Sequence, residues 1–226
     1  MGRYSCEQVA QAIDHSLLHP ALPDAALEAG CRAAAEWGVA SACVKPYFVG
    51  RARDLLQGTP AKAITTVGFP HGAHAITVKV AEAKTAIGQG AEELDIVINI
   101  GKVKSGDWGY LEDEVIALAE TAHDGGSILK VIFENCYLTK EEKRQLCRIS
   151  RRAGADFIKT STGFGDGGAT DEDLQLMLHE AGDAMGVKAA GGVRSYRHAA
   201  RLLDMGVRRI GASQTERILA ECRQDT

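Results

Sequence analysis

Short apolar runs alternate along this chain with longer stretches in which apolar residues recur at the spacing of an amphipathic helix. The alternation repeats eight times without a linker or a low-complexity segment. The runs that we predict to be strands span residues 12–18, 39–44, 62–69, 93–100, 128–134, 155–161, 187–191 and 208–213. Repeated strand–helix units favour a parallel sheet, and eight of them in 226 residues favour closure. The pattern therefore predicts an α/β fold, a (β/α)8 TIM barrel in a single domain over residues 1–226.

The ends of several predicted helices carry signals of their own. Thr139 and Glu142 have the spacing of a capping box, and Pro23 suits the first turn of a helix. Glycines that let the chain turn back in the left-handed conformation follow the helical stretches at Gly38, Gly90, Gly154 and Gly206. No GxGxxG sequence follows the first strand, which argues against a dinucleotide-binding fold, because that fold needs glycines beneath the pyrophosphate.

Composition limits the partners and the location. The chain is 45% hydrophobic and 25% charged, with a formal net charge of -4, as in an ordinary globular α/β protein. The net charge and a pI near 6.0 argue against a broad polyanion-binding face, because nucleic-acid binders generally show clustered Lys and Arg. No apolar stretch is as long as a membrane span, and the polar N-terminal segment lacks the apolar core of a signal peptide. We therefore expect a cytoplasmic protein without nucleic-acid or membrane partners.

Six cysteines are scattered along the chain, at positions 6, 31, 43, 136, 147 and 222, and none belongs to a CxxC pair. Their spacing indicates neither a zinc site nor a disulfide framework. We expect reduced thiols that are mostly buried.

Ionisable residues inside the predicted strands are the informative exceptions, because the strands of a parallel barrel are covered on both sides. They are Asp95, Lys130, Lys159 and Lys188, each from a different predicted strand. Burying an unpaired charge is costly or shifts the pKa of the group until it is neutral, so each residue needs a partner or a function. A structural ion-pair network and a catalytic site both account for any one of them.

Taken together, three lysines and one aspartate leave an excess of positive charge, and repulsion with desolvation lowers the pKa of a lysine. A lysine with a lowered pKa has a populated free amine, the nucleophile that forms a Schiff base with an aldehyde or ketone. The carboxylate of Asp95 is suited to shuttle protons during that reaction. Lys159 lies near the carboxyl end of its strand, where barrel active sites are built. This charge argument does not rank Lys159 above Lys188.

A phosphate site is predicted beside these residues. Gly191 and Gly192 follow the seventh predicted strand, and Gly211 and Ser213 end the eighth, both just before helical segments. Barrels commonly hold phosphate after these two strands, through backbone N–H groups and a helix N-terminus. The joint placement predicts a phosphorylated small-molecule substrate.

A metal site is a weaker interpretation of the histidines. His71 with His74, and His15 with His19, have spacings that permit shared ligation, but no carboxylate cluster accompanies them. Cys43 has no general base nearby in the sequence that would activate its thiol. We expect neither a metal nor another cofactor.

Six segments carry a family resemblance, namely IDHSLL, VGFPHG, ELDIVINIGKVKSGD, LKVIFENCYLT, ADFIKTSTGF and VKAAGGVR. In the same order, and over nearly the whole chain, they resemble segments of the deoxyribose-phosphate aldolases. The resemblance implies a class I aldolase that reversibly cleaves 2-deoxy-D-ribose 5-phosphate to D-glyceraldehyde 3-phosphate and acetaldehyde. Family precedent also implies a homo-oligomer, either a dimer or a tetramer.

The resemblance assigns roles residue by residue. Lys159 in FIKTSTG is similar to the lysine that forms the Schiff base, and Asp95 in ELDIVINIG to the proton-shuttling carboxylate. Lys188 in KAAGGVR is similar to the ammonium that lowers the pKa of the nucleophile and joins the proton relay. The further positions expected to bind substrate are Asp14, Cys43, Lys130, Thr160, Gly191, Gly192, Gly211 and Ser213. Of these, Gly191, Gly192 and Ser213 are similar to the phosphate-contacting positions of the family.

Three features depart from the family pattern. Lys45 stands where many members have Asn, and Phe164 where some have Lys. The chain ends in CRQDT, without the C-terminal tyrosine that some members bring to the site. These departures bear on substrate preference rather than on the reaction of an amine with a carbonyl.

Three alternatives remain open at this point. A related class I lyase on another phosphorylated or deoxy sugar would use the same lysine, so a panel of substrates separates it from the first hypothesis. A non-catalytic phosphosugar-binding barrel would bind without turnover. A metal-dependent aldolase would lose activity on chelation.

Overall fold

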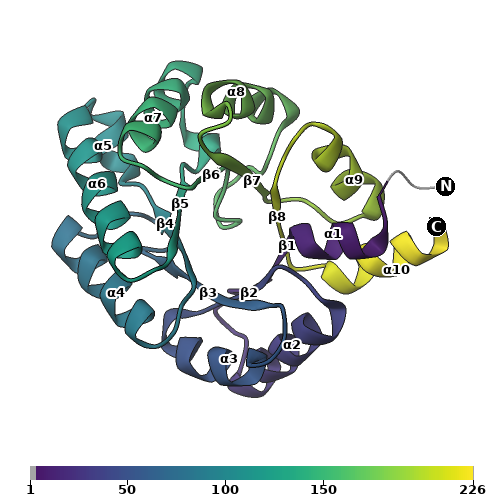
Figure 1. Ribbon diagram of the computed structural model, residues 1–226. Coiled ribbons are helices and arrows are strands. Elements are labelled where there is room, and N and C mark those ends of the chain that lie inside the picture. The colour runs from purple at the N-terminus through teal and green to yellow at the C-terminus, as the bar shows by residue number, and fades with distance from the viewer. Residues whose placement is uncertain (1–3, 226) are drawn as a thin grey trace.

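A computed structural model describes residues 4–225 and shows a closed barrel of eight parallel strands, paired in chain order from β1 to β8 and from β8 back to β1 (Figure 1). The strands are β1 (Ile13–Leu17), β2 (Ser41–Val44), β3 (Lys62–Val67), β4 (Glu93–Val97), β5 (Ile128–Ile132), β6 (Phe157–Lys159), β7 (Gly186–Ala190) and β8 (Arg209–Ala212). Each lies within or overlaps one of the eight predicted runs. The predicted (β/α)8 barrel is confirmed.

Helices surround the barrel on its outer side (Figure 1). They are α1 (Cys6–Ala12), α2 (Asp24–Trp37), α3 (Val49–Leu56), α4 (Ile76–Gly88), α5 (Ile100–Lys104), α6 (Trp108–Asp124), α7 (Lys140–Arg152), α8 (Asp171–Ala181), α9 (Tyr196–Asp204) and α10 (Thr215–Asp225), with short 3-10 turns η1 (Pro46–Phe48) and η2 (Asn135–Tyr137). Over residues 4–225, no helix has the length and apolar character needed to span a bilayer.

The main hydrophobic core lies between the strands and the helices, where side chains such as Ile96, Val131 and Ile158 are fully buried. A second, much smaller apolar cluster contains Leu18, Cys43 and Ile64, with Phe69 packed against it. Because successive side chains of a strand point to opposite faces, the outward residues build the main core while their neighbours turn inward. This separation leaves the interior of the barrel free to hold polar side chains.

The strand register brings the charged residues together. Asp95 of β4 is paired with Lys130 of β5, and Lys159 of β6 with Lys188 of β7. Side chains at paired positions of neighbouring strands point to the same face of the sheet. Ile132, two residues after Lys130 on β5, is paired with Lys159, so the register alone places all four ionisable residues on one face.

The predicted capping box and helix-end glycines are confirmed, while Pro23 is the residue that precedes α2 rather than part of its first turn. Thr139 and Glu142 form the reciprocal bonds of a capping box at the start of α7. The four predicted helix-end glycines have positive φ values of 65°, 102°, 79° and 101°, at Gly38, Gly90, Gly154 and Gly206. Glycine adopts this left-handed conformation at little energetic cost, and the conformation turns the chain back toward the next strand.

The expectation of six reduced thiols is wrong for one pair. Cys6 and Cys222 form a disulfide with a Cα–Cα distance of 5.7 Å, which joins α1 to α10. Figure 1 shows these two helices side by side, although 216 residues separate the cysteines in the sequence. Closure of the barrel brings the two cysteines together, so the spacing of cysteines along the sequence does not predict the bond. The other thiols are free, with Cys31, Cys43 and Cys147 buried and Cys136 exposed.

We expect the disulfide to stabilise the barrel, because it removes conformational freedom from the unfolded chain. The Cys6→Ser variant should lower the free energy of unfolding by about 2–4 kcal/mol. Urea titration of the parent and the variant, each with and without reductant, measures this change. Cys136→Ser is the control, because replacing an exposed free thiol should change the free energy of unfolding by less than about 0.5 kcal/mol. Equal unfolding midpoints for oxidised and reduced parent would contradict the expectation.

Candidate active site

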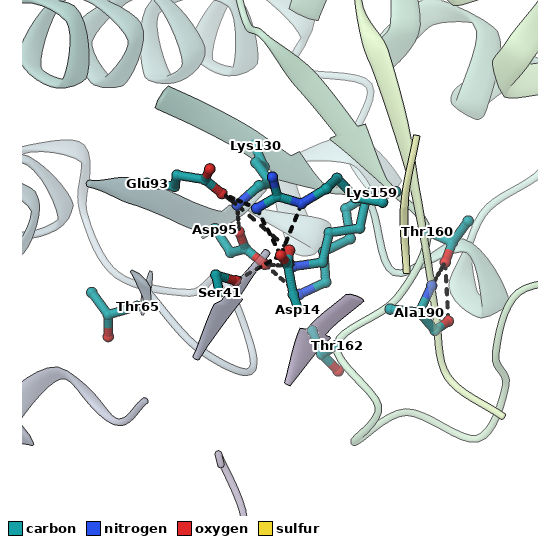
Figure 2. A network of polar contacts seen from close by, with 12 residues as sticks. Asp14, Ser41, Thr65, Glu93, Asp95, Lys130, Lys159, Thr160, Thr162 and Ala190 are labelled. Carbon is teal, nitrogen blue, oxygen red and sulfur yellow. Dashed lines mark hydrogen bonds and ion pairs between the residues drawn. The ribbon is translucent and has the colours of Figure 1, made fainter. Parts of the chain in front are cut away.

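Seven charged side chains gather inside the barrel, three carboxylates and four cations (Figure 2). They are Asp14 of β1, Glu93 and Asp95 of β4, Lys130 of β5, Lys159 of β6, Lys188 of β7 and Arg209 of β8. Glu93 and Asp95 are two residues apart on one strand, so they share a face. The convergence predicted for Asp95 and the three lysines is confirmed.

Asp95 lies at the centre of this cluster and contacts three ammonium groups. Its Oδ2 is 2.7 Å from the Nζ of Lys159 and 2.6 Å from the Nζ of Lys188. Its Oδ1 is 2.9 Å from the Nζ of Lys130. One carboxylate therefore connects all three predicted lysines, and Figure 2 shows Lys130 and Lys159 pointing toward it.

The other two carboxylates hold the remaining charges. Lys188 is 2.5 Å from Oδ2 of Asp14, and Lys130 is 2.5 Å from Oε2 of Glu93. Arg209 lies between the two acids, 2.7 Å from Asp14 and 2.5 Å from Glu93. The structural ion-pair network is thus present. A catalytic role requires, in addition, one lysine whose pKa differs from those of the others.

Lys159 differs from the other lysines in its pKa. Burial lowers the pKa of Lys159, and the neighbouring Lys188 ammonium lowers it further, against the attraction of Asp95. Burial also lowers the pKa of Lys188, but Asp14 and Asp95 together raise it above its ordinary value. Burial lowers the pKa of Lys130 too, but Asp95 and Asp14 outweigh this effect, so that pKa is likewise above its ordinary value. Lys159 is the lysine of the cluster whose free amine is favoured.

The carboxylates stay ionised for the opposite reason. Burial pushes the pKa of Asp95 upward, yet Lys130, Lys159 and Lys188 outweigh it and hold that pKa well below its usual range. The pKa of Asp14 is also lowered, by Lys188, Lys130 and Arg209 against its burial. The ionised carboxylate of Asp95 is therefore in contact with the amine of Lys159 and can accept a proton from it.

A cavity of about 520 Å³ lies next to this cluster. The predicted site residues among its lining are Asp14, Cys43, Lys159, Lys188, Gly191, Gly192, Gly211 and Ser213. The two predicted ends of a substrate site, amine and phosphate, therefore border one space. Asp95 and Lys130 are fully buried and do not line it.

Thr160 lies apart from the cavity lining. Its hydroxyl donates to the carbonyl of Ala190 and accepts the N–H of the same residue, both at 3.0 Å (Figure 2). These bonds join β6 to β7 beside Lys159. A direct contact of Thr160 with substrate stays a prediction.

Three site residues escaped the sequence reasoning. Glu93 and Arg209 complete the ion pairs, and Arg194 lines the cavity next to Gly192. Two of them could have been predicted from the sequence. Glu93 is two residues before Asp95 on the same predicted strand and so points to the same face, and Arg194 directly follows the GGV sequence. Arg209 lies in a predicted strand beside Arg208, and nothing in the sequence says which of the two points inward.

Two residues that depart from the family pattern have defined places. Lys45 donates to the carbonyl oxygens of Pro20, at 3.2 Å, and Leu22, at 2.8 Å, so it holds the segment between β1 and α2. It is not among the residues that line the cavity. Phe164 does line the cavity and is 47% exposed.

Cys43 and His15, which both line the cavity, are uncharged near neutral pH. Burial raises the pKa of the Cys43 thiol to about 11, so the thiol stays protonated near neutrality. Burial lowers the pKa of His15 to about 4, and its Nδ1 is 2.9 Å from the Thr215 hydroxyl. Within residues 4–225, no group of three or more His, Cys, Asp or Glu is arranged to hold a metal ion.

Comparison with known proteins agrees with this geometry. Residues 8–215 match the DeoC/LacD family of aldolases. A deoxyribose-phosphate aldolase of Rhodopirellula baltica is 47% identical over 99% of this chain and 93% of its own. One from Caldanaerobacter subterraneus subsp. tengcongensis is 46% identical over 96% of this chain and 94% of its own.

A solved structure gives the same result in three dimensions. It is described as a unique tetrameric structure of deoxyribose phosphate aldolase from Aeropyrum pernix, and it superposes with a TM-score of 0.91 at 31% sequence identity. The superposition covers 98% of this chain and 94% of that one. The resemblance seen in the sequence motifs is confirmed, and the chain belongs to the DeoC/LacD family of aldolases.

Proposed function

We propose that this aldolase reversibly cleaves 2-deoxy-D-ribose 5-phosphate to D-glyceraldehyde 3-phosphate and acetaldehyde, through a Schiff base on Lys159. The observation that carries the proposal is a lysine of lowered pKa that both lines the cavity and contacts a buried carboxylate. The substrate is that of the relatives named deoxyribose-phosphate aldolase.

The reaction begins at the amine of Lys159. The free amine attacks the C1 carbonyl of the open-chain sugar, and the resulting carbinolamine loses water to give an iminium ion. When the C3 hydroxyl loses its proton, C3 becomes the carbonyl carbon of the departing D-glyceraldehyde 3-phosphate. The electron pair of the broken C2–C3 bond moves into the iminium to give an enamine. Protonation at C2 and hydrolysis release acetaldehyde and restore the amine.

Asp95 and Lys188 support these steps. The shared Oδ2 of Asp95 lies within hydrogen-bond distance of both amines, so a proton can pass among them without entering bulk water. The same carboxylate offsets the positive charge of the iminium. Lys188 remains an ammonium because Asp14 also holds it, and its charge favours the free amine of Lys159.

The phosphate would bind at the other end of the cavity. Gly191 and Gly192 have φ values of 87° and 90°, which other residues rarely adopt and which suit a loop that turns backbone N–H groups toward an anion. Ser213 and the guanidinium of Arg194 line the same cavity. A guanidinium suits a phosphate because it offers several donors in one plane.

Assembly and location extend the proposal. The Aeropyrum pernix relative is described as tetrameric, and exposed apolar side chains at Tyr47, Val78, Ile116 and Tyr137 offer surfaces for contact between copies. We therefore include a homo-oligomer in the proposal. A cytoplasmic location accords with a charged sugar phosphate, which does not cross an apolar bilayer unaided.

The test of the function is the Lys159→Ala variant. Borohydride with acetaldehyde should trap an adduct on the parent and none at residue 159 of the variant, because the variant lacks the amine. Retro-aldol turnover of 2-deoxy-D-ribose 5-phosphate should fall by about 1,000-fold or more. A coupled assay and peptide mass mapping measure both effects.

The control for this test is Lys84→Ala, which removes an exposed lysine of α4. It should be trapped and turn over as the parent does. A chelator should leave parent activity unchanged if the reaction needs no metal. Turnover without trapping, or activity lost on chelation, would count against the proposal.

The pH dependence of imine formation should respond to Lys188. Lys159 has a pKa below its ordinary value near 10.5, so trapping should rise with pH through that lowered pKa. Lys188→Met removes a repelling cation and leaves Asp95 with fewer partners, and both changes raise the pKa of Lys159. The midpoint of the pH profile of cyanoborohydride trapping should therefore move upward, whereas Lys84→Met should not move it. A downward shift would contradict the role given to Lys188.

Arg194→Met should weaken binding of the phosphorylated substrate. Loss of a charge-assisted hydrogen bond corresponds to an increase in KM of about 10- to 100-fold. The KM for unphosphorylated 2-deoxy-D-ribose should not change, since it lacks the group that Arg194 binds. Arg197→Met, on the exposed surface of α9, removes the same charge as a control. An equal effect on both substrates would show that Arg194 does not contact the phosphate.

A further inference from the structure

A buried carboxylate outside the charged cluster lies under the loop that follows β6. Among residues 4–225, Glu134 is the only non-glycine residue with a positive φ, at 56°. It is 2% exposed and lies two residues beyond the end of β5. A left-handed conformation is unfavourable for Glu, so surrounding contacts must hold it there, and such positions cluster at functional sites.

Both oxygens of the Glu134 carboxylate bind one residue of that loop. Thr162 donates its N–H to Oε1 at 3.2 Å and its hydroxyl to Oε2. The hydroxyl oxygen of Thr162 in turn accepts the N–H of Phe164 at 3.0 Å. A continuous set of hydrogen bonds thus connects Glu134 to the backbone of Phe164.

Glycines allow the loop to lie directly against this segment. A Cβ at Gly165 would be 3.0 Å from the Sγ of Cys136, and a Cβ at Gly167 would be 2.7 Å from its Cβ. Further along, the N–H of Ala169 donates to the carbonyl of Gly191 at 3.2 Å. The loop is therefore fixed at both ends, and Figure 1 shows the green segment after β6 bending toward the barrel axis.

The ring of Phe164 continues an apolar wall of the cavity. It is 5.3 Å from the ring of Phe69, centre to centre, with the planes at 88°, a favourable edge-to-face arrangement. Phe69 packs on the cluster that contains Leu18, Cys43 and Ile64. Leu18, Cys43 and Phe164 all line the cavity. This apolar wall spans the ends of β1, β2 and β3 and is completed by a residue from beyond β6.

The cavity thus has two chemically different walls, and Lys159 lines it as well. The proposed phosphate groups, Gly191, Gly192 and Arg194, come from the end of β7 and the segment after it. A phosphate held there, with C1 bonded to Lys159, would leave the apolar wall to the carbons that become the aldehyde donor.

We propose that Glu134 is a positioning residue of the aldol site: through Thr162 it holds the Phe164 ring against Phe69, and this ring limits the size of the donor aldehyde. The inference rests on the proposed function and extends it to the donor end of the substrate. Acetaldehyde fits beside the ring, whereas propanal carries one more carbon into it.

Exchange of the donor α-protons in D2O tests this without a phosphorylated acceptor. The amine condenses with the aldehyde and releases water, loss of one α-proton gives the enamine, and a deuteron from solvent replaces that proton before hydrolysis. NMR gives the exchange rates of propanal and acetaldehyde with the full chain, after subtraction of the Lys159→Ala rate. The quantity of interest is their ratio, which cancels any loss of folded enzyme.

Removing either member of the contact should favour the larger donor. One methylene in an apolar pocket changes selectivity about 10-fold, so Phe164→Ala should raise the propanal-to-acetaldehyde ratio by about that factor. Glu134→Ala should raise it in the same direction, and the double variant should not exceed the larger single effect, because both act through one ring. Phe164 is half exposed, so its substitution is compatible with folding.

Two further variants separate positioning from general destabilisation. Glu134→Gln should keep the parent ratio, since its amide can accept the Thr162 N–H and donate to the Thr162 hydroxyl. Thr170→Ala removes a hydrogen bond to the N–H of Asp173 at the far end of the same loop and should leave the ratio unchanged. The inference is overturned if Glu134→Ala slows both donors equally, or if Thr170→Ala changes the ratio as much as Glu134→Ala does.

Failure of the proposed function has a different signature. A parent that exchanges both donors but does not cleave 2-deoxy-D-ribose 5-phosphate would refute the substrate, while the donor ratios would still decide the role of Glu134. A parent that exchanges neither donor would refute the Schiff-base function and this inference with it.

Discussion

The buried carboxylate of Asp95, in contact with the ammonium groups of Lys130, Lys159 and Lys188, is the interaction on which the rest of the site depends. Without it, four cations, the three lysines and Arg209, would share the barrel interior with only Asp14 and Glu93 to offset them. Breaking a buried ion pair by removing one partner typically costs about 3–5 kcal/mol. The cluster is therefore both a structural requirement of the barrel interior and the source of the unequal pKa values of its lysines.

The fold was accessible from the sequence because it depends on local periodicity. Each strand lies in or overlaps a short apolar run, and the four predicted helix-end glycines have positive φ values. Predicted strands such as 62–69 and 93–100 extend beyond the observed ends because apolar residues continue into the loops at the carboxyl ends. The Cys6–Cys222 bond was missed because only closure of the barrel brings the chain ends together.

The site was accessible in part. Ionisable residues in the strands identified four members of the cluster, because charge inside a covered strand is rare. The sequence could not separate Lys159 from Lys188 without the family resemblance, since the difference lies in Asp14, which contacts Lys188 from a distant strand. Arg209 and the contact of Glu134 with Thr162 were invisible for the same reason: each depends on which side chains from remote segments meet.

The disulfide between α1 and α10 has a topological consequence. In a closed barrel built in chain order, the first and last strands meet at one seam, and here β1 pairs with β8 there. That seam is the natural place for a barrel to begin to open, because no segment of the chain connects its two sides directly. A covalent bond between the helices flanking those strands turns the chain into a ring across the seam, so that neither terminal strand can peel away alone.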